Sequence, residues 1–179
     1  MSLQDTYKKK IVPELQKEFE IKNLNAVPAI KQITVNVGLG IGLKETKYLE
    51  TAENTLRRIT GQQPVQTKAR KSIANFKIRQ GNVVGMKVTL RGPRMWNFLD
   101  KLINVTFARI RDFRGLSPKS FDGQGNYSVG FTEHIAFPEI RSDEIEVIHG
   151  LQVNIETTAQ NPKQAKSLLT HLGFPFKKA

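Results

Sequence analysis

The residues with the most evident chemistry lie between Thr67 and Gly81, in the sequence TKARKSIANFKIRQG. The stretch contains one aromatic residue, Phe76, no acid, and five cations, which are Lys68, Arg70, Lys71, Lys77 and Arg79. It lies within an acid-free run, because no Asp or Glu occurs between Glu53 and Asp100. Those 46 residues contain ten Lys or Arg and carry +10 of the formal net charge of +12. Because clustered Lys and Arg neutralise phosphates, we expect this stretch to contact a phosphate backbone.

The sequence contains no recognisable catalytic or metal-binding motif. The histidines are far apart in sequence and match no zinc-site spacing. The glycine-rich GLGIG lacks the third glycine of a dinucleotide-binding motif, because Leu43 stands at that position. An acid–base group built from Asp112, Asp122 or Glu133 with His134 is an alternative that nothing favours over ordinary surface charge. We therefore predict that the protein is not an enzyme and binds no metal and no cofactor.

The overall composition favours a polyanionic partner. A pI near 10.0 points first to nucleic acid and second to an anionic membrane surface, for which no basic amphipathic helix is visible. No apolar run is long enough for a membrane span, and the N-terminal residues do not resemble a signal peptide, so we predict no membrane association. The absence of cysteine excludes disulfides and thiolate metal sites. A chain of 179 residues suits one domain, and we predict a single domain over residues 1–179.

Alternating apolar residues predict the strands that must position the basic stretch. Residues 30–37 place Ile33, Val35 and Val37 on one face and Thr34 and Asn36 on the other. The same alternation predicts strands at 83–90 and 151–157, and weaker patterns predict strands at 64–67 and 129–137. The connection between 67 and 83 is about 15 residues, so it extends roughly 23 Å if it folds back on itself. Connections of this length are usually functional or disordered.

Apolar stripes with helical spacing predict five helices. They lie at residues 3–19, 45–60, 93–110, 142–148 and 161–172. Pro13 is expected to bend the first helix or divide it in two, whereas Pro93 suits the first turn of the third. Trp96 and Phe98 of the third helix are expected in the core rather than on a base-stacking surface. Residues 111–130 are rich in glycine and are predicted to form a surface loop.

The order of these elements predicts an α+β fold. We expect one domain with a mostly antiparallel sheet, helices packed on one face in a split βαβ-like core, and a long basic loop. The other sheet face would carry polar and cationic residues, namely Thr34, Asn36, Lys87, Thr89, Arg91, Gln152 and Asn154. Such a mixture suits nucleic acid, because cations hold phosphates while amides and hydroxyls reach sugars and base edges. The alternative is a sheet face that is merely exposed to solvent.

Several long blocks resemble a known family. The blocks are LRRITGQQPVQTKARKS (56–72), FKIRQG (76–81), KVTLRG followed by RMW (87–96), RIRDFRGL, KSFDGQGNYS and the closing GFPFK. Together they are similar to the bacterial large-subunit ribosomal protein five family, which binds 5S rRNA, and the similarity extends nearly from end to end. Gln124 stands where that family is expected to have arginine, and Pro93 where a charged residue is expected, so the resemblance does not extend to these two positions.

The resemblance implies a structural role in the cytoplasmic ribosome. It implies attachment of 5S rRNA to the large subunit in the central protuberance, by a sheet surface that includes Asn36, Gln62, Thr67 and Thr89. We expect nearby cations to complete this rRNA site, namely Lys68, Arg70, Lys87 and Arg91. The implied partners are 5S rRNA, 23S rRNA and other ribosomal proteins of the central protuberance.

The resemblance implies two further contacts. The segment 72–80 matches a loop that reaches the P-site tRNA, with Ser72, Asn75, Phe76, Lys77, Arg79 and Gln80 as candidate contacts. The segments 111–126 and 139–146 match a mobile bridge to protein thirteen of the small-subunit head, with Arg111, Arg114 and Asp143 as candidates. A free-standing RNA-binding regulator or chaperone, and an RNA-processing enzyme, are the rival functions; the enzyme would need a carboxylate or metal cluster near the basic run.

Overall fold

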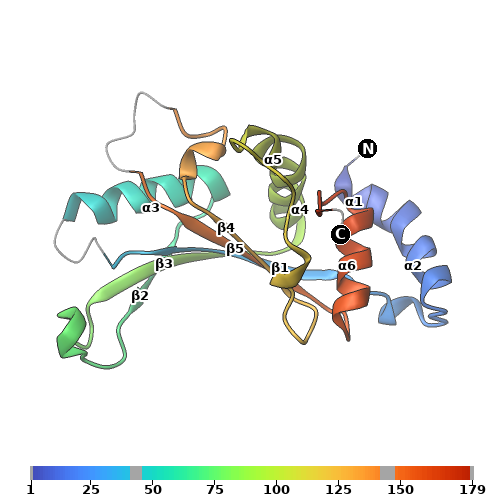
Figure 1. Ribbon diagram of the computed structural model, residues 1–179, viewed down its shortest axis with the longest axis horizontal. Coiled ribbons are helices and arrows are strands. Elements are labelled where there is room, and N and C mark those ends of the chain that lie inside the picture. Colours follow the sequence, from blue (N-terminus) through green and yellow to red (C-terminus); the bar gives the residue numbers. More distant parts are fainter. Residues whose placement is uncertain (1, 41–45, 142–147, 178–179) are drawn as a thin grey trace. The chain divides into compact units, whose positions relative to one another are not determined.

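The computed structural model describes residues 2–40, 46–141 and 148–177 (Figure 1). Its helices are α1 (Leu3–Thr6), α2 (Val12–Glu18), α3 (Thr46–Thr60), α4 (Gly92–Lys101), α5 (Phe107–Arg109) and α6 (Pro162–His171). Its strands are β1 (Ile30–Gly38), β2 (Val65–Lys68), β3 (Val83–Leu90), β4 (Tyr127–Phe131) and β5 (Leu151–Thr157). Among the described helices, none is long and apolar enough to span a membrane.

The chain packs into two compact units. Unit 1 comprises Met1–Ile33, Leu90–Val129 and Asn154–Ala179, and unit 2 comprises Thr34–Thr89 and Gly130–Val153. Strands β1 and β5 therefore contribute residues to both units. The single domain over residues 1–179 stays a prediction.

The described strands form one five-stranded sheet in the order β2-β3-β1-β5-β4. β2 and β3 are antiparallel, with Val65 opposite Lys87 and Thr67 opposite Gly85. The start of β1 lies beside the end of β5, because Thr158 N donates to Ala29 O at 2.9 Å and Lys31 reaches Glu156. The predicted α+β class with an antiparallel sheet is confirmed.

Burial along the strands confirms the predicted register. Val35 and Val37 of β1, Met86 and Val88 of β3, and Val153 of β5 are buried. Their neighbours in sequence point to the opposite face and are half-buried or exposed, as for Asn36, Lys87 and Gln152. A period of two places alternate residues on opposite faces, so β1, β3 and β5 each have one apolar face and one polar face.

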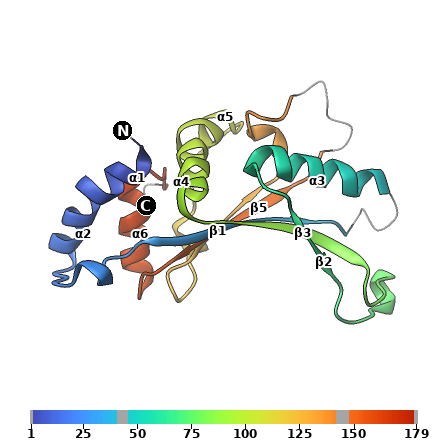
Figure 2. The ribbon, with the colours of Figure 1, turned by 180° about the vertical axis from the view of Figure 1, so that it is seen from behind.

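In unit 2, α3 covers the apolar face of the strands (Figures 1 and 2). Ala52, Leu56 and Ile59 are buried, and the buried stripe begins at Tyr48, which is 7% exposed, whereas Leu49 is half-buried. Tyr48 lies one turn before Ala52, so it continues the stripe better than Leu49. The helix ends at Gly61, whose φ of 65° suits glycine.

In unit 1, Pro13 divides the first predicted helix. Ser2 caps α1 through a reciprocal pair with Asp5, whose carboxylate hydrogen bonds hold its pKa below the usual range. A π-helical turn, Tyr7–Ile11, then precedes α2, and Val12 N donates to Tyr7 O. A proline ring clashes with the carbonyl four residues earlier, and the wider turn accommodates it. The expectation of two short pieces is confirmed.

The third predicted helix is also divided. α4 begins at Gly92 rather than Pro93, and a π-helical turn, Leu102–Thr106, separates it from α5. Trp96 is 8% exposed and its ring lies 5.3 Å from that of Tyr7, so its predicted core position is confirmed. Phe98 is buried as well. The last helix, α6, begins at Pro162, after Asn161 accepts a hydrogen bond from Gln164 N at 2.9 Å.

Other predicted boundaries were wrong. The strand predicted at 129–137 is β4, which ends at Phe131 and is followed by a 3-10 turn at His134–Ala136. The chain turns there because the rings of Phe131 and Phe137 pack 5.3 Å apart and His134 N donates to His149 O. The strand predicted at 64–67 begins and ends one residue later as β2, and the helix predicted at 142–148 falls mostly outside the described residues.

Two histidines that match no motif stack in the core of unit 2. The rings of His134 and His149 lie 4.1 Å apart and 8° from parallel, and both residues are buried. His149 N donates to His134 Nδ1 at 3.2 Å. Burial, and then the neighbouring His134, lowers the pKa of His149 to about 4. The pair is therefore neutral at pH 7 and contributes to the core as two flat rings.

We expect stability to fall as this pair is protonated. The pKa of His149 is about 4 in the folded state, below roughly 6.5 in the unfolded chain, so stability is lost as pH falls from about 6.5 towards 4. Replacing His149 by Gln should reduce this loss, measured as the difference in urea unfolding free energy between pH 7 and pH 5. His171→Gln, at an exposed position, is the control. Equal pH dependence in the wild type and His149→Gln would contradict the prediction.

Candidate RNA-binding surface

The polar face of unit 2 gathers the predicted rRNA residues from three strands. Asn36 comes from β1, Thr67 from β2, and Lys87 and Thr89 from β3. Lys87 is exposed, whereas Asn36, Thr67 and Thr89 are half-buried. Half-buried amides and hydroxyls have already lost part of their side-chain freedom, so a partner that orders them pays less entropy than it would for fully exposed side chains. The face is therefore suited to contacts that depend on the shape of a partner.

Gln62 joins this face although it lies outside the strands. It follows the C-terminal end of α3, and its Nε2 donates to Thr89 O at 3.3 Å. Its backbone N also donates to Thr60 Oγ1 at 3.3 Å, so both ends of the residue are held. The structure therefore brings Gln62 and Thr89 together across 27 residues of sequence.

Gly85 allows Thr67 to lie close to β3. A Cβ on Gly85 would meet Thr67 Oγ1 at 2.9 Å and Val37 O at 3.0 Å, both closer than ordinary contacts. The strand therefore needs a residue without a side chain at this position. The hydroxyl of Thr67 occupies the space that a side chain would fill, so Gly85 fixes part of the polar face.

The basic stretch is an extension of the β2–β3 hairpin rather than an open loop. Ala69 N donates to Asn82 O at 2.8 Å, and Gly81 N donates to Ala69 O at 3.0 Å. Further out, Ile73 and Ile78 exchange two backbone hydrogen bonds of 2.8 and 3.1 Å. The two sides are thus paired along much of their length, and the hairpin extends beyond the sheet of unit 2 (Figures 1 and 2).

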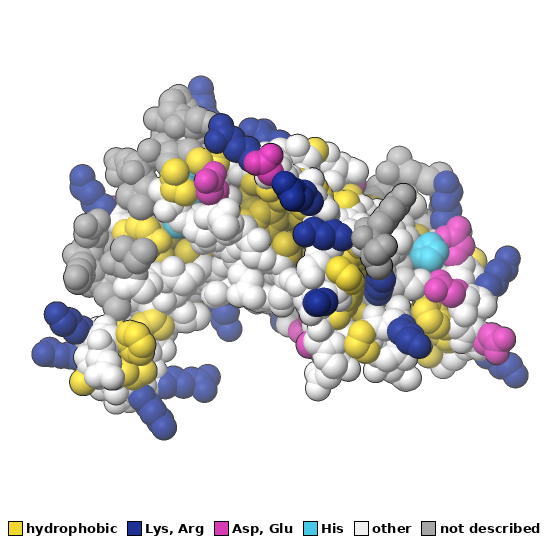
Figure 3. Space-filling view, viewed as in Figure 1, with side chains coloured by type: hydrophobic (Ala, Val, Ile, Leu, Met, Phe, Trp, Pro, Cys, Tyr) yellow, Lys and Arg dark blue, Asp and Glu magenta, His cyan; other side chains and the backbone are white. Residues whose placement is uncertain are grey.

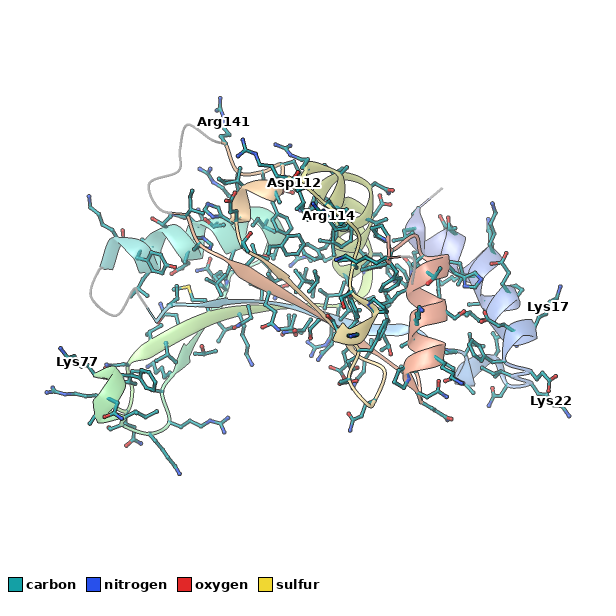
Figure 4. All side chains as sticks on the ribbon, in the orientation of Figure 1. Lys17, Lys22, Lys77, Asp112, Arg114 and Arg141 are labelled. Carbon is teal, nitrogen blue, oxygen red and sulfur yellow. The ribbon has the colours of Figure 1, made fainter. Side chains whose placement is uncertain are left out.

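The tip of the hairpin presents cations around an apolar centre. Ala74–Phe76 form a 3-10 turn, and Lys77 has a φ of 54°, which reverses the chain. Ser72 Oγ accepts a hydrogen bond from Gln80 N at 3.0 Å and closes the turn at its base. Phe76 is 71% exposed, and Figure 3 shows apolar side chains on this lobe with Lys and Arg projecting around them. Figure 4 places Lys77 at its outer end.

The other tip residues are also accessible. Ser72, Asn75, Arg79 and Gln80 are exposed, as are Lys68 and Arg70 nearer the sheet. The tip residues belong to unit 2, as do the predicted rRNA residues apart from Arg91. Thr67, Lys68, Arg70, Lys87 and Thr89 lie on the hairpin that ends in the tip, whereas Asn36 comes from β1 and Gln62 follows α3.

The remaining predicted residues lie in unit 1 or outside the described part. Arg91 is exposed directly before α4, and Arg111 and Arg114 are exposed in the loop after α5. Asp143 lies outside the described residues. In the loop after α5, Asp122 accepts hydrogen bonds from Gln124 N at 2.9 Å and from Asn126 N at 2.7 Å. A side-chain bond from Asn126 is the main reason that the pKa of Asp122 is lowered.

One polar group of unit 1 has no counterpart among the predicted sites. Glu156 of β5 accepts hydrogen bonds from Lys31 and Gln32 of β1. The alternation of β5 places Glu156 on the polar face, but its partners follow only from the order of the strands. Among the described residues there is no cluster of three His, Asp or Glu side chains that could hold a metal ion.

Comparison with known proteins identifies the family. Residues 23–79 match the family model described as ribosomal protein L5, and residues 83–176 match the model of the C-terminus of the same ribosomal family. A large ribosomal subunit protein uL5 from Thermotoga maritima is 52% identical over 98% of this chain and 96% of its own length. The uL5 of Francisella tularensis subsp. mediasiatica is 55% identical over 98% of both chains.

The basic α+β fold and these matches define a structural, non-enzymatic protein of the ribosome, of a kind that binds RNA. The chain belongs to the ribosomal protein L5 family. Membership confirms the predicted family, the predicted place in the large subunit of the cytoplasmic ribosome, and the prediction that the protein is not an enzyme.

We expect Gly85→Ala to destabilise the protein by about 1–3 kcal/mol, the usual cost of overpacking, because the new methyl group would meet Thr67 and the Val37 carbonyl. Gly38→Ala is a matched control, since nothing lies within 4 Å of a Cβ at that position. Unfolding in urea measures both. Equal stability of the two variants would show that the strands can move apart, and that Thr67 is not held as described.

Proposed function

We propose that the protein binds 5S rRNA with the polar face of its sheet and attaches it in the central protuberance of the large subunit. The observation that carries this proposal is the set of half-buried polar groups, Asn36, Thr67 and Thr89, next to the basic hairpin. Gln62, bonded to β3, adds an amide beside Thr89. The cations Lys68, Arg70 and Lys87 surround these groups, and Arg91 follows β3.

The mechanism is positioning by two kinds of contact. Lys and Arg neutralise phosphates without regard to sequence, and they supply most of the attraction. The hydroxyls and amides then select a backbone whose sugars and base edges meet them, as the wide minor groove of an RNA helix does. Because residues 54–99 contain no carboxylate, no acid in this run opposes the approach of phosphate.

We propose that the hairpin tip contacts the elbow of the P-site tRNA. The paired strands give the tip a defined direction, and the exposed cations Lys77 and Arg79 offer charge to a second RNA. Phe76 is exposed beside them and can stack on a nucleotide. Ser72, Asn75 and Gln80 offer neutral hydrogen-bonding groups at the same end.

A third contact belongs to the loop after α5. We propose that Arg111 and Arg114, together with Asp143, take part in a bridge to protein thirteen of the small-subunit head. The exposed position of both arginines supports an intermolecular role. Within the large subunit, the proposed partners of this protein are 23S rRNA and neighbouring proteins of the central protuberance.

The proposed function predicts preference for 5S rRNA over tRNA and over an unrelated transcript of equal length. If about 6 cations engage phosphates, the logarithm of affinity should fall against the logarithm of salt concentration with a slope of about −5. Asn36→Ala and Thr89→Ala should each weaken 5S rRNA binding about 5-fold, the scale of one hydrogen bond, without unfolding the protein. Asn54→Ala, at an exposed position of α3, is the control.

Equal affinity for all three RNAs would instead favour a general RNA chaperone. A sharp fall in melting temperature for Asn36→Ala or Thr89→Ala would mean that the lost binding reflects lost folding. Co-purification of the native protein with 5S rRNA in ribosomal fractions would support the assignment independently.

The hairpin predicts a separable effect on tRNA. Phe76→Ala should leave the melting temperature unchanged, because the side chain is exposed and packs on little. The same change should weaken crosslinking to P-site tRNA in assembled ribosomes, by up to about 5-fold for one lost stack, while 5S rRNA binding is retained. Val65→Ala, at another exposed apolar position of the hairpin, is the control. Unchanged crosslinking of Phe76→Ala would remove this residue from the tRNA site.

A further inference from the structure

A carboxylate lies beside the cations of the polar face in unit 1. Glu156 Oε1 accepts a hydrogen bond from Lys31 Nζ at 2.6 Å, and Glu156 Oε2 accepts one from Gln32 Nε2 at 2.5 Å. The donors come from β1 and the acceptor from β5, which are neighbours in the sheet. Both carboxylate oxygens are thus engaged, and the orientation of the group is fixed by two donors.

This carboxylate carries its charge under the conditions in which RNA binds. The hydrogen bond from Lys31 is the main reason that the pKa of Glu156 lies below its usual range. Gln32 and the positive charges of Lys31 and Arg91 act in the same direction, and partial burial acts against them. The side chain is 35% exposed, so a molecule laid on this face meets the charge.

The charge of Glu156 changes what this part of the surface attracts. A phosphate and an ionised carboxylate both carry negative charge and both only accept hydrogen bonds, so the two repel each other. Lys31 is already paired with Glu156, and the charge of Arg91 is partly offset by it. A phosphate placed here must separate an ion pair or approach an anion. The same phosphate placed on the hairpin meets only cations and neutral groups.

We propose that Glu156 is a specificity-determining residue that acts by repulsion. It disfavours RNAs, and docking registers of one RNA, that place a phosphate over the Lys31–Glu156 pair. This inference rests on the proposed binding of 5S rRNA. The hairpin cations attract any RNA, and discrimination then needs contacts that penalise the wrong ones. A structured RNA of the right shape keeps its phosphates away from Glu156. An unrelated RNA is disfavoured in every docking register that brings one of its phosphates close to Glu156.

The test compares Glu156→Gln with Glu50→Gln. Both substitutions raise the net charge by one, but Glu50 is exposed on α3 and belongs to no strand. Affinity is measured for 5S rRNA and for an unrelated structured transcript of equal length, over a range of salt concentrations. Glu156→Gln should bind the unrelated transcript about 5-fold more tightly, the scale of one exposed charge interaction. Its salt slope should steepen by about 0.9, as expected for one more phosphate contact.

The deciding quantity is the ratio of the affinity for 5S rRNA to the affinity for the unrelated transcript. It should fall in Glu156→Gln and stay constant in Glu50→Gln, and the double variant Lys31→Met, Glu156→Gln should lose the steeper slope. A melting curve checks folding, and Glu156→Thr, which suits a strand, repeats the test if the glutamine variant is unstable.

Four outcomes would overturn the inference. Equal tightening for both RNAs would mean that only net charge matters. Weaker binding of 5S rRNA alone would mean that Glu156 accepts hydrogen bonds from the RNA. If the wild type shows no preference for 5S rRNA over the unrelated transcript, both the proposed function and the inference are wrong. If the wild type shows this preference and Glu156→Gln keeps it unchanged, only the inference is wrong.

Discussion

The polar surface of this protein depends on the burial of only one face of strands β1, β3 and β5. Val35 and Val37 of β1 are fully buried, so Asn36 between them must point to the opposite side. A slip of one residue in register would bury Asn36 and expose both valines, at a cost that no surface contact offsets. The register that forms the core therefore also fixes which polar groups lie on the proposed RNA-binding face. Folding and recognition share one constraint, and a substitution in the core can disturb the surface without touching it.

The hairpin obeys a different constraint, because it has almost no core. Residues 70–77 are exposed, and like charges along them repel one another. Backbone hydrogen bonds between its two sides, such as those of Ile73 with Ile78, oppose that repulsion. The exposure of Ile73 and Phe76 is costly for an isolated protein and is explained if a partner covers them. In the proposed complex the RNA supplies both the countercharge and the cover, so the hairpin gains its stability on binding.

Features with a strong local period could be predicted from the sequence, and features that depend on tertiary contacts could not. The alternation of β1, β3 and β5 predicted which residues lie on the polar face, and Pro13 predicted the division of the first helix. The pairing of the hairpin was missed, because residues 67–81 contain neither a regular alternation nor a two-residue turn motif. The contact of Gln62 with Thr89 depends on where α3 ends against the sheet. The pairing of Lys31 with Glu156 depends on which strands are neighbours, a fact that no local pattern contains.

In the proposed function, attraction and discrimination have separate sources. A net charge of +12 attracts every RNA, and adding cations would raise all affinities together. Discrimination requires groups whose energy depends on the position of the partner atoms. Half-buried Asn36 and Thr89 are such groups, because an unsatisfied amide or hydroxyl costs free energy when a poorly fitting RNA excludes water from it. An anion such as Glu156 is another, because its repulsion falls only on phosphates that come close. The few groups that weaken binding to a wrong RNA therefore matter more for selection than the many that strengthen binding to all.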